Sequence, residues 1–316
     1  MAGATRKLEL GLLLRNGEQP DWRVVRWAEL REMAKVAEAV GIDTLWVADH
    51  VLVRSGPGSS VPEGKTRGVH EAWTLLSALA EATSAVGLGP FVACTSFRNP
   101  AMLAKMADTL EEVSGGRLVL GLGAGWHQPE YDAFGFPFDH LASRFEEALQ
   151  VIVPLLREGR VDFEGQYYQA RDCELRPRGP RPNGPPIWIG ANKPRMLRLT
   201  ARYADAYNTV WHSSPAELAE PFARLEAACH EVGRDPLTIG RTAGAFLWLP
   251  GPGDESASPR PEALKGTPEQ IAAQLHAFHA AGAEHMTVIL DPWDVRAVER
   301  LGRVVEALRG LEASSG

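Results

Sequence analysis

Cysteine is scarce in this sequence, with three residues among 316. Cys94, Cys173 and Cys229 lie far apart along the chain. An odd number of scattered cysteines suits neither a disulfide framework nor a cysteine-based zinc site, and we expect a reducing, cytoplasmic environment. Since His, Asp and Glu residues nowhere show the close spacing that is typical of metal ligands, we predict that the protein has no metal site.

Clustered positive charge and long apolar runs are also lacking. The chain has 33 Lys and Arg residues against 40 Asp and Glu residues, a net charge of −7, and no stretch combines basic with aromatic residues as a nucleic-acid-binding surface does. No segment approaches the ~20 consecutive apolar residues that cross a bilayer, and the N-terminus lacks the apolar core of a signal peptide. We therefore expect a small-molecule partner rather than a nucleic acid or a membrane.

The sequence does contain a regular alternation of short apolar runs and longer segments with helical spacing. Eight runs are typical of strands buried on both faces, as in a parallel sheet covered by helices. They span residues 8–14, 44–50, 86–93, 117–125, 186–191, 206–212, 238–249 and 285–292. A strand-then-helix unit that occurs eight times predicts an α/β fold, a (β/α)8 TIM barrel formed by one domain over residues 1–316. An open Rossmann sheet is less favoured, because the Gly-x-Gly-x-Gly at 121–125 lacks the full dinucleotide fingerprint.

Helix starts and loops follow from local composition. Residues 214–217 (SPAE) and 267–270 (TPEQ) each combine an N-cap hydroxyl, a proline and an acid or amide, which predicts a capping box. Three segments depart from the repeat and are rich in Gly, Pro, Ser or Arg, at 54–68, 159–185 and 250–262. We expect them to be insertion loops at the C-terminal face of the barrel, where they would shape a substrate pocket.

Residues able to carry chemistry gather where the predicted strands end. The second strand ends on Asp49 and His50, an acid beside a base, although Gly, Asn or Ser would supply turn geometry without charge. In a parallel barrel the C-terminal strand ends converge on one cavity. The other candidates at these ends are Val92, Ala93, Cys94, Gly123, Ala124, Gly125, Trp126, His127, Gly190, Ala191, Asn192, Lys193, Trp211 and His212. Small residues admit close approach of backbone, and Trp and Cys supply apolar walls, so we expect a flat, sizeable ligand.

The end of the fifth strand has a second feature. Gly190, Ala191 and Asn192 are followed by Lys193, a proline and a helical pattern. Backbone N–H groups at a helix N-terminus with cations nearby favour a phosphate group. A glycine turn with an exposed lysine is the alternative interpretation of the same residues.

Four stretches resemble the bacterial luciferase-like superfamily, and most closely its branch of deazaflavin (coenzyme F420)-dependent oxidoreductases. They are GIDTLWVADH, EAWTLLSALAEATSAVGLGPFV, FRNPAMLAKMADTLEEVSGGRLVLGLGAGWHQPEYDAFGFPF and PPIWIGANKPRMLRLTARYADAYN. The resemblance covers residues 8–212 strongly and the remainder more loosely. It implies a cofactor ring across the C-terminal mouth, an insertion near strand three or four, a non-prolyl cis peptide around Phe91-Val92, and a homodimer.

The resemblance also implies roles for single residues. Asp49 would hydrogen-bond the ring region, and His50 would stand beside the reacting carbon as an acid, a base or a substrate-orienting group. An unperturbed histidine pKa of about 6.5 suits proton transfer near neutrality. Gly123, Ala124 and Gly125 would form a tight strand end under the ring, with Trp126 as a wall. Sugar-phosphate dehydrogenases of the superfamily have a glutamate in place of Trp126, which argues against a sugar-phosphate substrate.

Four further residues near the mouth are candidates. Glu130 and Arg144 belong to the family pattern, and a structural ion pair that closes the mouth is the favoured interpretation. His127 and His212 either line the substrate side or are solvated loop histidines.

The resulting hypothesis is hydride transfer between C5 of the F420 deazaflavin and a small, uncharged, partly hydrophobic substrate. His50 would manage the accompanying proton, while the cofactor carries the hard chemistry. An FMN-dependent monooxygenase of the same fold is the alternative. A non-catalytic barrel that binds a ligand is a further alternative.

Overall fold

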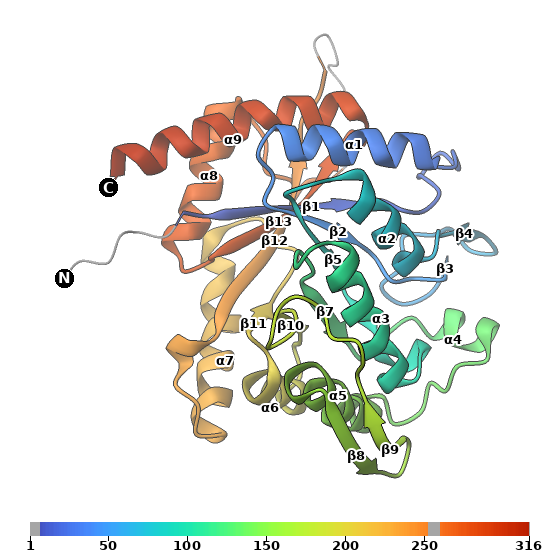
Figure 1. Ribbon diagram of the computed structural model, residues 1–316. Helices are drawn as coiled ribbons and strands as arrows, with labels where there is room; N and C mark the ends of the chain where they lie inside the picture. Colours follow the sequence, from blue (N-terminus) through green and yellow to red (C-terminus); the bar gives the residue numbers. More distant parts are fainter. Residues whose placement is uncertain (1–6, 252–259, 316) are drawn as a thin grey trace.

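A parallel β-barrel ringed by helices forms the body of the protein (Figure 1), as the computed structural model describes it over residues 7–251 and 260–315. The barrel strands are β1 (Glu9–Leu14), β2 (Thr44–Val47), β5 (Gly87–Pro90), β6 (Ala93–Cys94), β7 (Leu120–Gly123), β10 (Ile187–Gly190), β11 (Ala206–Asn208), β12 (Gly240–Trp248) and β13 (His285–Asp291). The surrounding helices are α1 (Trp27–Ala39), α2 (Ala72–Ala82), α3 (Pro100–Val113), α5 (Leu141–Glu158), α6 (Pro194–Tyr203), α7 (Ala219–Glu231), α8 (Pro268–Ala280) and α9 (Val295–Ser315). All eight predicted strands are present.

The strands close into a ring. They pair in the order β5-β2-β1-β13-β12-β11-β10-β7-β6, and every pair is parallel. β5 and β6 are two parts of the third predicted strand, separated by Phe91 and Val92. A bridge between Leu88 and Leu118 joins β5 to the chain that enters β7. The TIM-barrel prediction is confirmed, and so is the predicted cis peptide, which links Phe91 to Val92.

Aromatic rings fill the interior of the barrel. Trp46 on β2 is fully buried, and its ring centroid lies 4.9 Å from that of Trp188 and 5.3 Å from that of Phe91. The contacts continue from Phe91 to Trp211 at 6.1 Å and from Trp211 to Phe246 at 4.9 Å. Side chains of this size leave the interior packed rather than open as a pore.

Two glycines make room for the indole of Trp46. A Cβ atom at Gly11 would lie 2.3 Å from Nε1 of Trp46, and one at Gly89 would lie 2.5 Å from its six-membered ring. Gly11 and Gly89 belong to the strands on either side of β2. Because no side chain fits at either position, these glycines are explained by packing and not by a turn.

Two of the predicted loops contain short antiparallel hairpins, and the prediction of plain loops was wrong there. β3 (Leu52–Arg54) pairs with β4 (Thr66–Gly68), and β8 (Arg160–Glu164) pairs with β9 (Gln169–Glu174). The exposed and half-buried residues of β8 alternate, which is the period of a one-sided strand, but the surrounding Gly, Pro and Arg hid this signal. Part of the third predicted loop, residues 252–259, lies outside the described residues.

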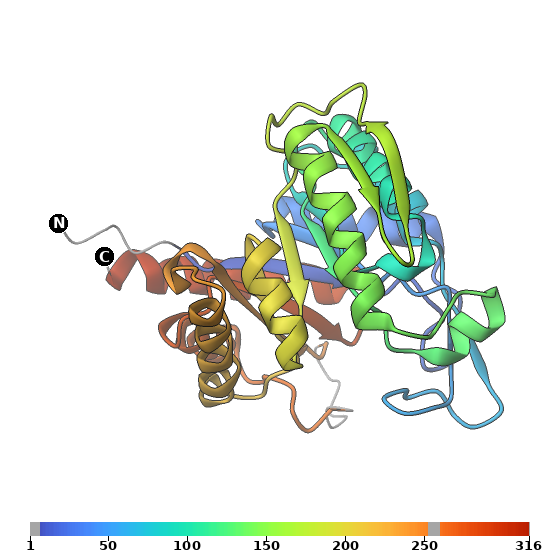
Figure 2. The same cartoon turned by 90° about the horizontal axis from the view of Figure 1, so that it is seen from below.

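The β8–β9 hairpin lies against α5 (Figure 2). Its turn is held by the carboxylate of Glu147, which accepts hydrogen bonds from the backbone N–H groups of Gln166, Tyr167 and Tyr168 at 2.8–3.0 Å. Three backbone donors on one carboxylate of α5 fix the position of the turn.

One of the two predicted capping boxes forms. Thr267 Oγ1 accepts from the N–H of Gln270, and Oε1 of Gln270 accepts from the N–H of Thr267 at 2.8 Å, so α8 begins as expected. The box predicted at 214–217 is wrong, because a 3₁₀ turn (η2, Pro215–Leu218) precedes α7 and Ser214 makes no cap. The Glu217 carboxylate instead accepts from Ser213. No helix within the described residues is both long and apolar enough to cross a membrane.

Candidate active site at the C-terminal mouth of the barrel

Asp49, just past the end of β2, holds other parts of the protein in place. Its carboxylate accepts two hydrogen bonds from Arg98, at 2.7 and 2.9 Å, and one from the Cys94 N–H at 3.0 Å. Burial raises the pKa of Asp49, and the charge of Arg98 and these hydrogen bonds oppose that rise. The side chain is 1% exposed. The structure thus gives no support to the expectation that Asp49 meets a ring directly, and it makes Asp49 a residue that ties β2 to β6.

His50 is held by a buried glutamate. Its Nδ1 lies 2.9 Å from Oε1 of Glu130, whose side chain is 2% exposed. Glu130 belongs to the short helix α4 (Gln128–Phe134) after β7, and its Oε2 also accepts from the Val51 N–H at 3.0 Å. The expectation that Glu130 pairs with Arg144 is wrong. Arg144 instead donates to Asp139 at 2.8 Å.

The Glu130 contact decides what the imidazole of His50 can do. A carboxylate is only an acceptor, so Nδ1 carries a proton and the other ring nitrogen, Nε2, is the site of exchange. The His50 side chain is 25% exposed, and Nε2 has no hydrogen-bond partner in the described part of the chain. This is the arrangement of an oriented general base or acid.

The two residues after Gly125 have different environments. Trp126 is half exposed, and its ring lies edge-on to His50 with centroids 5.7 Å apart. His127 is buried, and its Nε2 accepts from the Arg54 N–H of β3 at 2.9 Å. Burial lowers the pKa of His127. Trp126 is therefore placed as a wall beside His50, whereas His127 joins β3 to the mouth and is neither solvated nor open to a substrate.

Gly123 at the end of β7 and Gly125 just after it serve the protein's own packing. A Cβ at Gly123 would lie 2.6 Å from Val92 Cγ2, and one at Gly125, where φ is +81°, would lie 1.8 Å from the Tyr131 hydroxyl. Tyr131 donates to the Ala124 carbonyl at 2.9 Å and contacts Cys94 Sγ at 2.9 Å. The contacts with Val92 and Tyr131 explain why glycine stands at both positions, and the expected approach of a cofactor ring to them stays a prediction.

The Cys94 thiol is unreactive in this setting. It is buried, and burial raises its pKa to about 12. A thiol that stays protonated is a packing group with a weak donor, which here faces the Tyr131 oxygen. Cys94 thus contributes an apolar side and its backbone N–H to the site, as the sequence suggested for a wall.

The end of β10 is open in the way predicted. A Cβ at Gly190 would meet nothing nearer than 3.9 Å, which is ordinary contact distance. Helix α6 begins at Pro194, and its N-cap, Lys193, makes no side-chain capping bond. The first turn therefore presents uncapped N–H groups beside a lysine, a favourable place for an anion.

The remaining predicted histidine, His212, is buried behind the mouth. Its ring contacts Thr209 at 3.1 Å and Glu217 at 3.4 Å. Burial lowers its pKa. The peptide that precedes it, Val210-Trp211, is a second non-prolyl cis bond, which the sequence did not predict.

Sequence reasoning missed a charged cluster on the other side of the mouth. Arg15 follows β1 and donates to Asp291 at 2.6 Å, and Arg260 donates to the same carboxylate at 3.1 Å. The guanidinium of Arg260 lies 4.1 Å from the ring centroid of Phe246. Arg15 directly follows the first predicted strand, and Asp291 lies near the end of the eighth. The expectation that functional residues gather at C-terminal strand ends was applied only to strands two to six, and it would have identified both residues had it been applied to strands one and eight. Within residues 7–251 and 260–315, no three His, Cys, Asp or Glu side chains are arranged to hold a metal ion.

Comparison with known sequences identifies the family. A sequence profile described as luciferase-like monooxygenase matches residues 7–258. Phthiodiolone/phenolphthiodiolone dimycocerosates ketoreductase of Mycobacterium sp. (strain JLS) is 34% identical over 217 residues, which are 64% of this chain and 56% of the relative. Pyrimidine monooxygenase RutA of Klebsiella pneumoniae subsp. pneumoniae is 34% identical over 215 residues, which are 65% of this chain and 57% of the relative. The matches thus span little more than half of each relative.

Solved structures share the whole fold at low sequence identity. An F420-dependent secondary alcohol dehydrogenase in complex with an F420-acetone adduct superimposes with a TM-score of 0.75 at 20% identity, covering 96% of this chain and 99% of that one. Riboflavin lyase with modified FMN and riboflavin gives a TM-score of 0.79 at 16% identity, covering 97% of this chain and 92% of that one. The predicted resemblance is confirmed at the level of the superfamily. With its profile matched from residue 7 to residue 258, the protein belongs to the luciferase-like monooxygenase family, whose named relatives are oxidoreductases.

Proposed function

We propose that this protein is an oxidoreductase that binds coenzyme F420 at the C-terminal mouth and transfers a hydride between C5 of the deazaflavin and a small, uncharged substrate. The observation that carries the proposal is the orientation of His50 by Glu130 at 2.9 Å, with Nε2 left to the open side. A bound deazaflavin supplies the two-electron chemistry. The protein supplies orientation and a proton.

The residues at the mouth fit such a cofactor. A flat ring needs apolar neighbours, and Trp126 and Val92 offer them at two strand ends. A phosphate group needs donors, and the uncapped first turn of α6 with Lys193 offers them. Gly190 keeps the approach between the two free of a side chain.

Three side chains perform distinct tasks in this proposal. His50 Nε2 gives or takes the proton that accompanies hydride transfer. Glu130 keeps the Nδ1 proton in place and fixes the orientation of the imidazole ring. Asp49 acts through the backbone, because its hydrogen bond to the Cys94 N–H and its pair with Arg98 hold the bulge at 91–92.

The substrate class that the relatives favour is a ketone or a secondary alcohol. One relative is named a ketoreductase, and one structural neighbour is named a secondary alcohol dehydrogenase with an acetone adduct. The half-exposed ring of Trp126 lies edge-on to His50 and gives this side of the mouth an apolar surface. An uncharged carbonyl compound is consistent with that setting.

The second candidate is an FMN-dependent monooxygenase of the same family. It is favoured by the match to pyrimidine monooxygenase RutA, which equals the ketoreductase in identity, and by the structural likeness to an enzyme with modified FMN. The orientation of His50 serves either chemistry. A non-catalytic barrel is the third candidate, but a histidine oriented by a buried carboxylate has no evident role in one.

Binding titrations of the purified, cofactor-free protein separate these candidates. Oxidised F420 and FMN are each titrated, and quenching of cofactor fluorescence is followed. We expect F420 to bind at least tenfold more tightly than FMN, a difference of about 1.4 kcal/mol. Tighter binding of FMN would assign the protein to the monooxygenase branch, and binding of neither would leave the non-catalytic barrel.

A matched pair of variants tests whether the site is the mouth. Lys193→Ala removes a cation from the proposed phosphate site, and Lys35→Ala removes one from the exposed surface of α1. The first change should weaken cofactor binding severalfold and more at low salt, because the contact is electrostatic. The second should leave it unchanged. Equal behaviour of the two variants would argue against the phosphate site at α6.

A further inference from the structure

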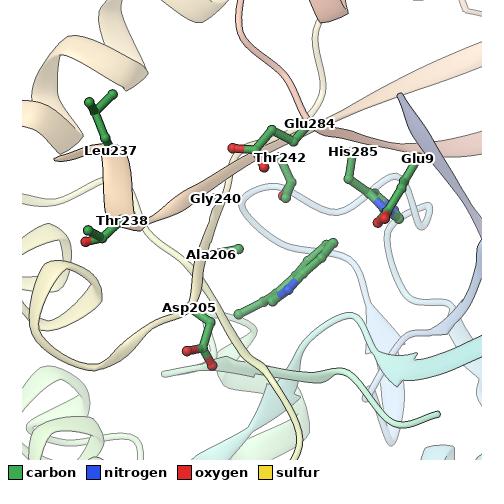
Figure 3. A pocket seen from close by; sticks show the side chains of 10 residues that line it. Glu9, Asp205, Ala206, Leu237, Thr238, Gly240, Thr242, Glu284 and His285 are labelled. Carbon is green, nitrogen blue, oxygen red and sulfur yellow. The ribbon is translucent and has the colours of Figure 1, made fainter. Parts of the chain in front are cut away.

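Ligands reach His50 from the mouth side, because packed rings close the barrel from its other end. A cavity of about 300 Å³ opens at that end, where β1, β11, β12 and β13 begin (Figure 3). Trp188 lines this cavity, and its ring centroid lies 4.9 Å from that of Trp46 in the barrel interior. These rings separate the cavity from the mouth. Whatever covers the mouth therefore controls access to His50.

The β3–β4 hairpin lies beside the part of the mouth that holds His50 and Trp126. Figure 1 and Figure 2 show the hairpin projecting from the barrel next to α4. A Cβ atom at Gly58, in the tip of the hairpin, would lie 3.2 Å from the indole of Trp126, and one at Gly56 would lie 4.0 Å from Pro129. The ring of Trp126 in turn lies edge-on to His50. The tip of the hairpin thus rests on the aromatic wall of the candidate site.

The base of the hairpin is fixed by hydrogen bonds to the rest of the protein. On β3, the Arg54 N–H donates to Nε2 of the buried His127 at 2.9 Å. On β4, the Gly68 N–H donates to the carboxylate of Glu18 at 2.7 Å, and the Gly68 carbonyl accepts from the Glu18 N–H at 2.9 Å. Both strands therefore stay anchored when the tip moves.

The tip, residues 55–65, is held more weakly than the base. Its N–H donors, such as those of Ser59 and Lys65 at 3.0 and 3.1 Å, bond to acceptors within the tip itself. Within the described part of the chain, no hydrogen bond or ion pair joins the tip to another element. Apolar contact holds it down, at the indole of Trp126 and through the buried side chain of Val61. Segments with so few bonds to their surroundings open at a low cost in free energy.

We propose that residues 55–65 form a lid, which opens between the anchored strands β3 and β4 to admit a ligand and closes on Trp126. Closure covers the mouth beside His50 and keeps water from the group that exchanges the proton. Gly58 is the positioning residue of this lid, because its φ of +78° and its contact with the indole both disfavour a side chain. The inference rests on the proposed function only for the place of the ligand.

Cleavage by an endoproteinase specific for lysine measures how often the tip is open. Lys65 is exposed in the tip, and Lys265 is exposed in the segment before α8, where its cleavage is the internal control. The cleavage rate follows the population of the open form when opening and closing are fast. Each rate is divided by that of the denatured variant, which removes the effect of the local sequence.

The first pair of variants removes the surface on which the tip rests, in the ligand-free protein. Trp126→Ala should raise the rate of cleavage after Lys65 about tenfold, because the apolar contact that favours closure is lost. Phe134→Ala removes another exposed ring, from α4, and should leave the rate unchanged. Cleavage after Lys265 should stay constant in both variants.

The second pair changes the tip itself. Gly58→Ala places a Cβ 3.2 Å from the indole of Trp126 and should also raise the rate of cleavage after Lys65. Gly64→Ala is the control, because its φ of +71° imposes a similar backbone strain in the same tip, but no atom lies within 4 Å of the added Cβ. Its effect should be several times smaller. If Trp126→Ala fails to fold, this pair decides.

A bound cofactor should hold the lid closed. Saturating F420 should slow cleavage after Lys65 about fivefold in the unaltered protein, and Trp126→Ala should lose most of this protection. If F420 does not bind, the proposed function fails, and the ligand-free variants still decide whether the lid exists.

Three results would overturn the proposal. The first is cleavage after Lys65 that is as fast in the folded as in the denatured protein, which would mean that the tip never closes. The second is an unchanged rate in Trp126→Ala or, where that variant fails to fold, equal rates in Gly58→Ala and Gly64→Ala. The third is binding of F420 without any protection of Lys65, which would show that the tip does not cover the ligand.

Discussion

The two ends of the barrel each contain a histidine with one ring nitrogen held by the protein, and the partner differs. At the mouth, the Glu130 carboxylate accepts from His50 Nδ1, so Nε2 faces outward as a base. At the opposite end, where the strands begin, the Trp46 indole donates to His285 Nε2, so the ring proton is on the buried Nδ1. An acceptor behind a histidine prepares it for proton transfer, whereas a donor behind it prepares it for binding an acceptor.

The charges around the two histidines differ as well. At the mouth, acids and bases are matched within the protein, as in the pairs of Asp49 with Arg98 and of Arg15 with Asp291. At the end where the strands begin, the carboxylates near His285 are much more exposed, at 40% for Glu9 and 51% for Asp205. Buried pairs hold a fixed geometry for chemistry, whereas exposed carboxylates are screened by solvent.

The largest expected effect is a loss of turnover when the histidine at the mouth is removed. His50→Ala should lower kcat by about 10²–10⁴-fold, because a positioned acid or base contributes this much. Cofactor affinity should be nearly unchanged. Single-turnover kinetics with bound cofactor measure the loss, and exposed His230 on α7 offers the control His230→Ala. Unchanged turnover in His50→Ala would show that another group handles the proton.

Removing a matched charge should cost the next largest amount. Arg98→Ala leaves the Asp49 carboxylate buried without its cation, and the free energy of unfolding should fall by about 3–5 kcal/mol. Denaturant unfolding of both proteins measures the difference. Arg198→Ala, on an exposed pair with Glu231, is the control and should cost less than about 1 kcal/mol. Similar losses in the two variants would mean that the Asp49 pair adds little.

A change beside Trp46 and His285 sharpens the comparison by disturbing packing alone. Gly11→Ala places a Cβ 2.3 Å from Trp46 Nε1 and 2.5 Å from His285 Nε2, so the two side chains must separate. We expect a loss of about 1–3 kcal/mol in the free energy of unfolding. Gly310→Ala, where no atom lies within 4 Å of the added Cβ, is the control in α9. A fully stable Gly11→Ala would show that Trp46 is free to move.

The smallest expected effect is a dependence on pH. Burial lowers the pKa of His127 in the folded protein, so the unfolded chain binds a proton more readily. The contribution of neutral His127 to the free energy of unfolding is fully present above about pH 6.5, the pKa of histidine in the unfolded chain. It is lost as the pH falls from there through the lower pKa that His127 has in the folded protein. His127→Gln should therefore lose less Tm than the unaltered protein between about pH 7 and pH 5. An identical pH profile would show that His127 is not the group responsible.

Much of the fold follows from local pattern. Eight apolar runs of strand length, each followed by a helical period, predict the barrel, and the structure differs mainly in the hairpins β3–β4 and β8–β9. These were missed because Gly, Pro and Arg dominate the flanking residues while the strand signal lasts only three to six residues. Short one-sided strands on the surface leave little trace in composition.

The candidate site was predictable in its position but not in its internal contacts. Asp49 and His50 stand at a C-terminal strand end, and in a parallel barrel these ends converge on one cavity. The partner of His50 is Glu130, 80 positions away, and no pattern in the sequence joins the two. The contact of His285 with Trp46 was not predicted for a related reason, because His285 stands at the beginning of β13, where the rule for barrels assigns no catalytic role.

The buried indole of Trp46 connects two regions of the barrel that are far apart in the sequence. Its N–H meets His285 at the start of β13, while its ring meets Phe91 beside the cis peptide that precedes β6. A substitution that displaces this one side chain would therefore disturb both regions at once.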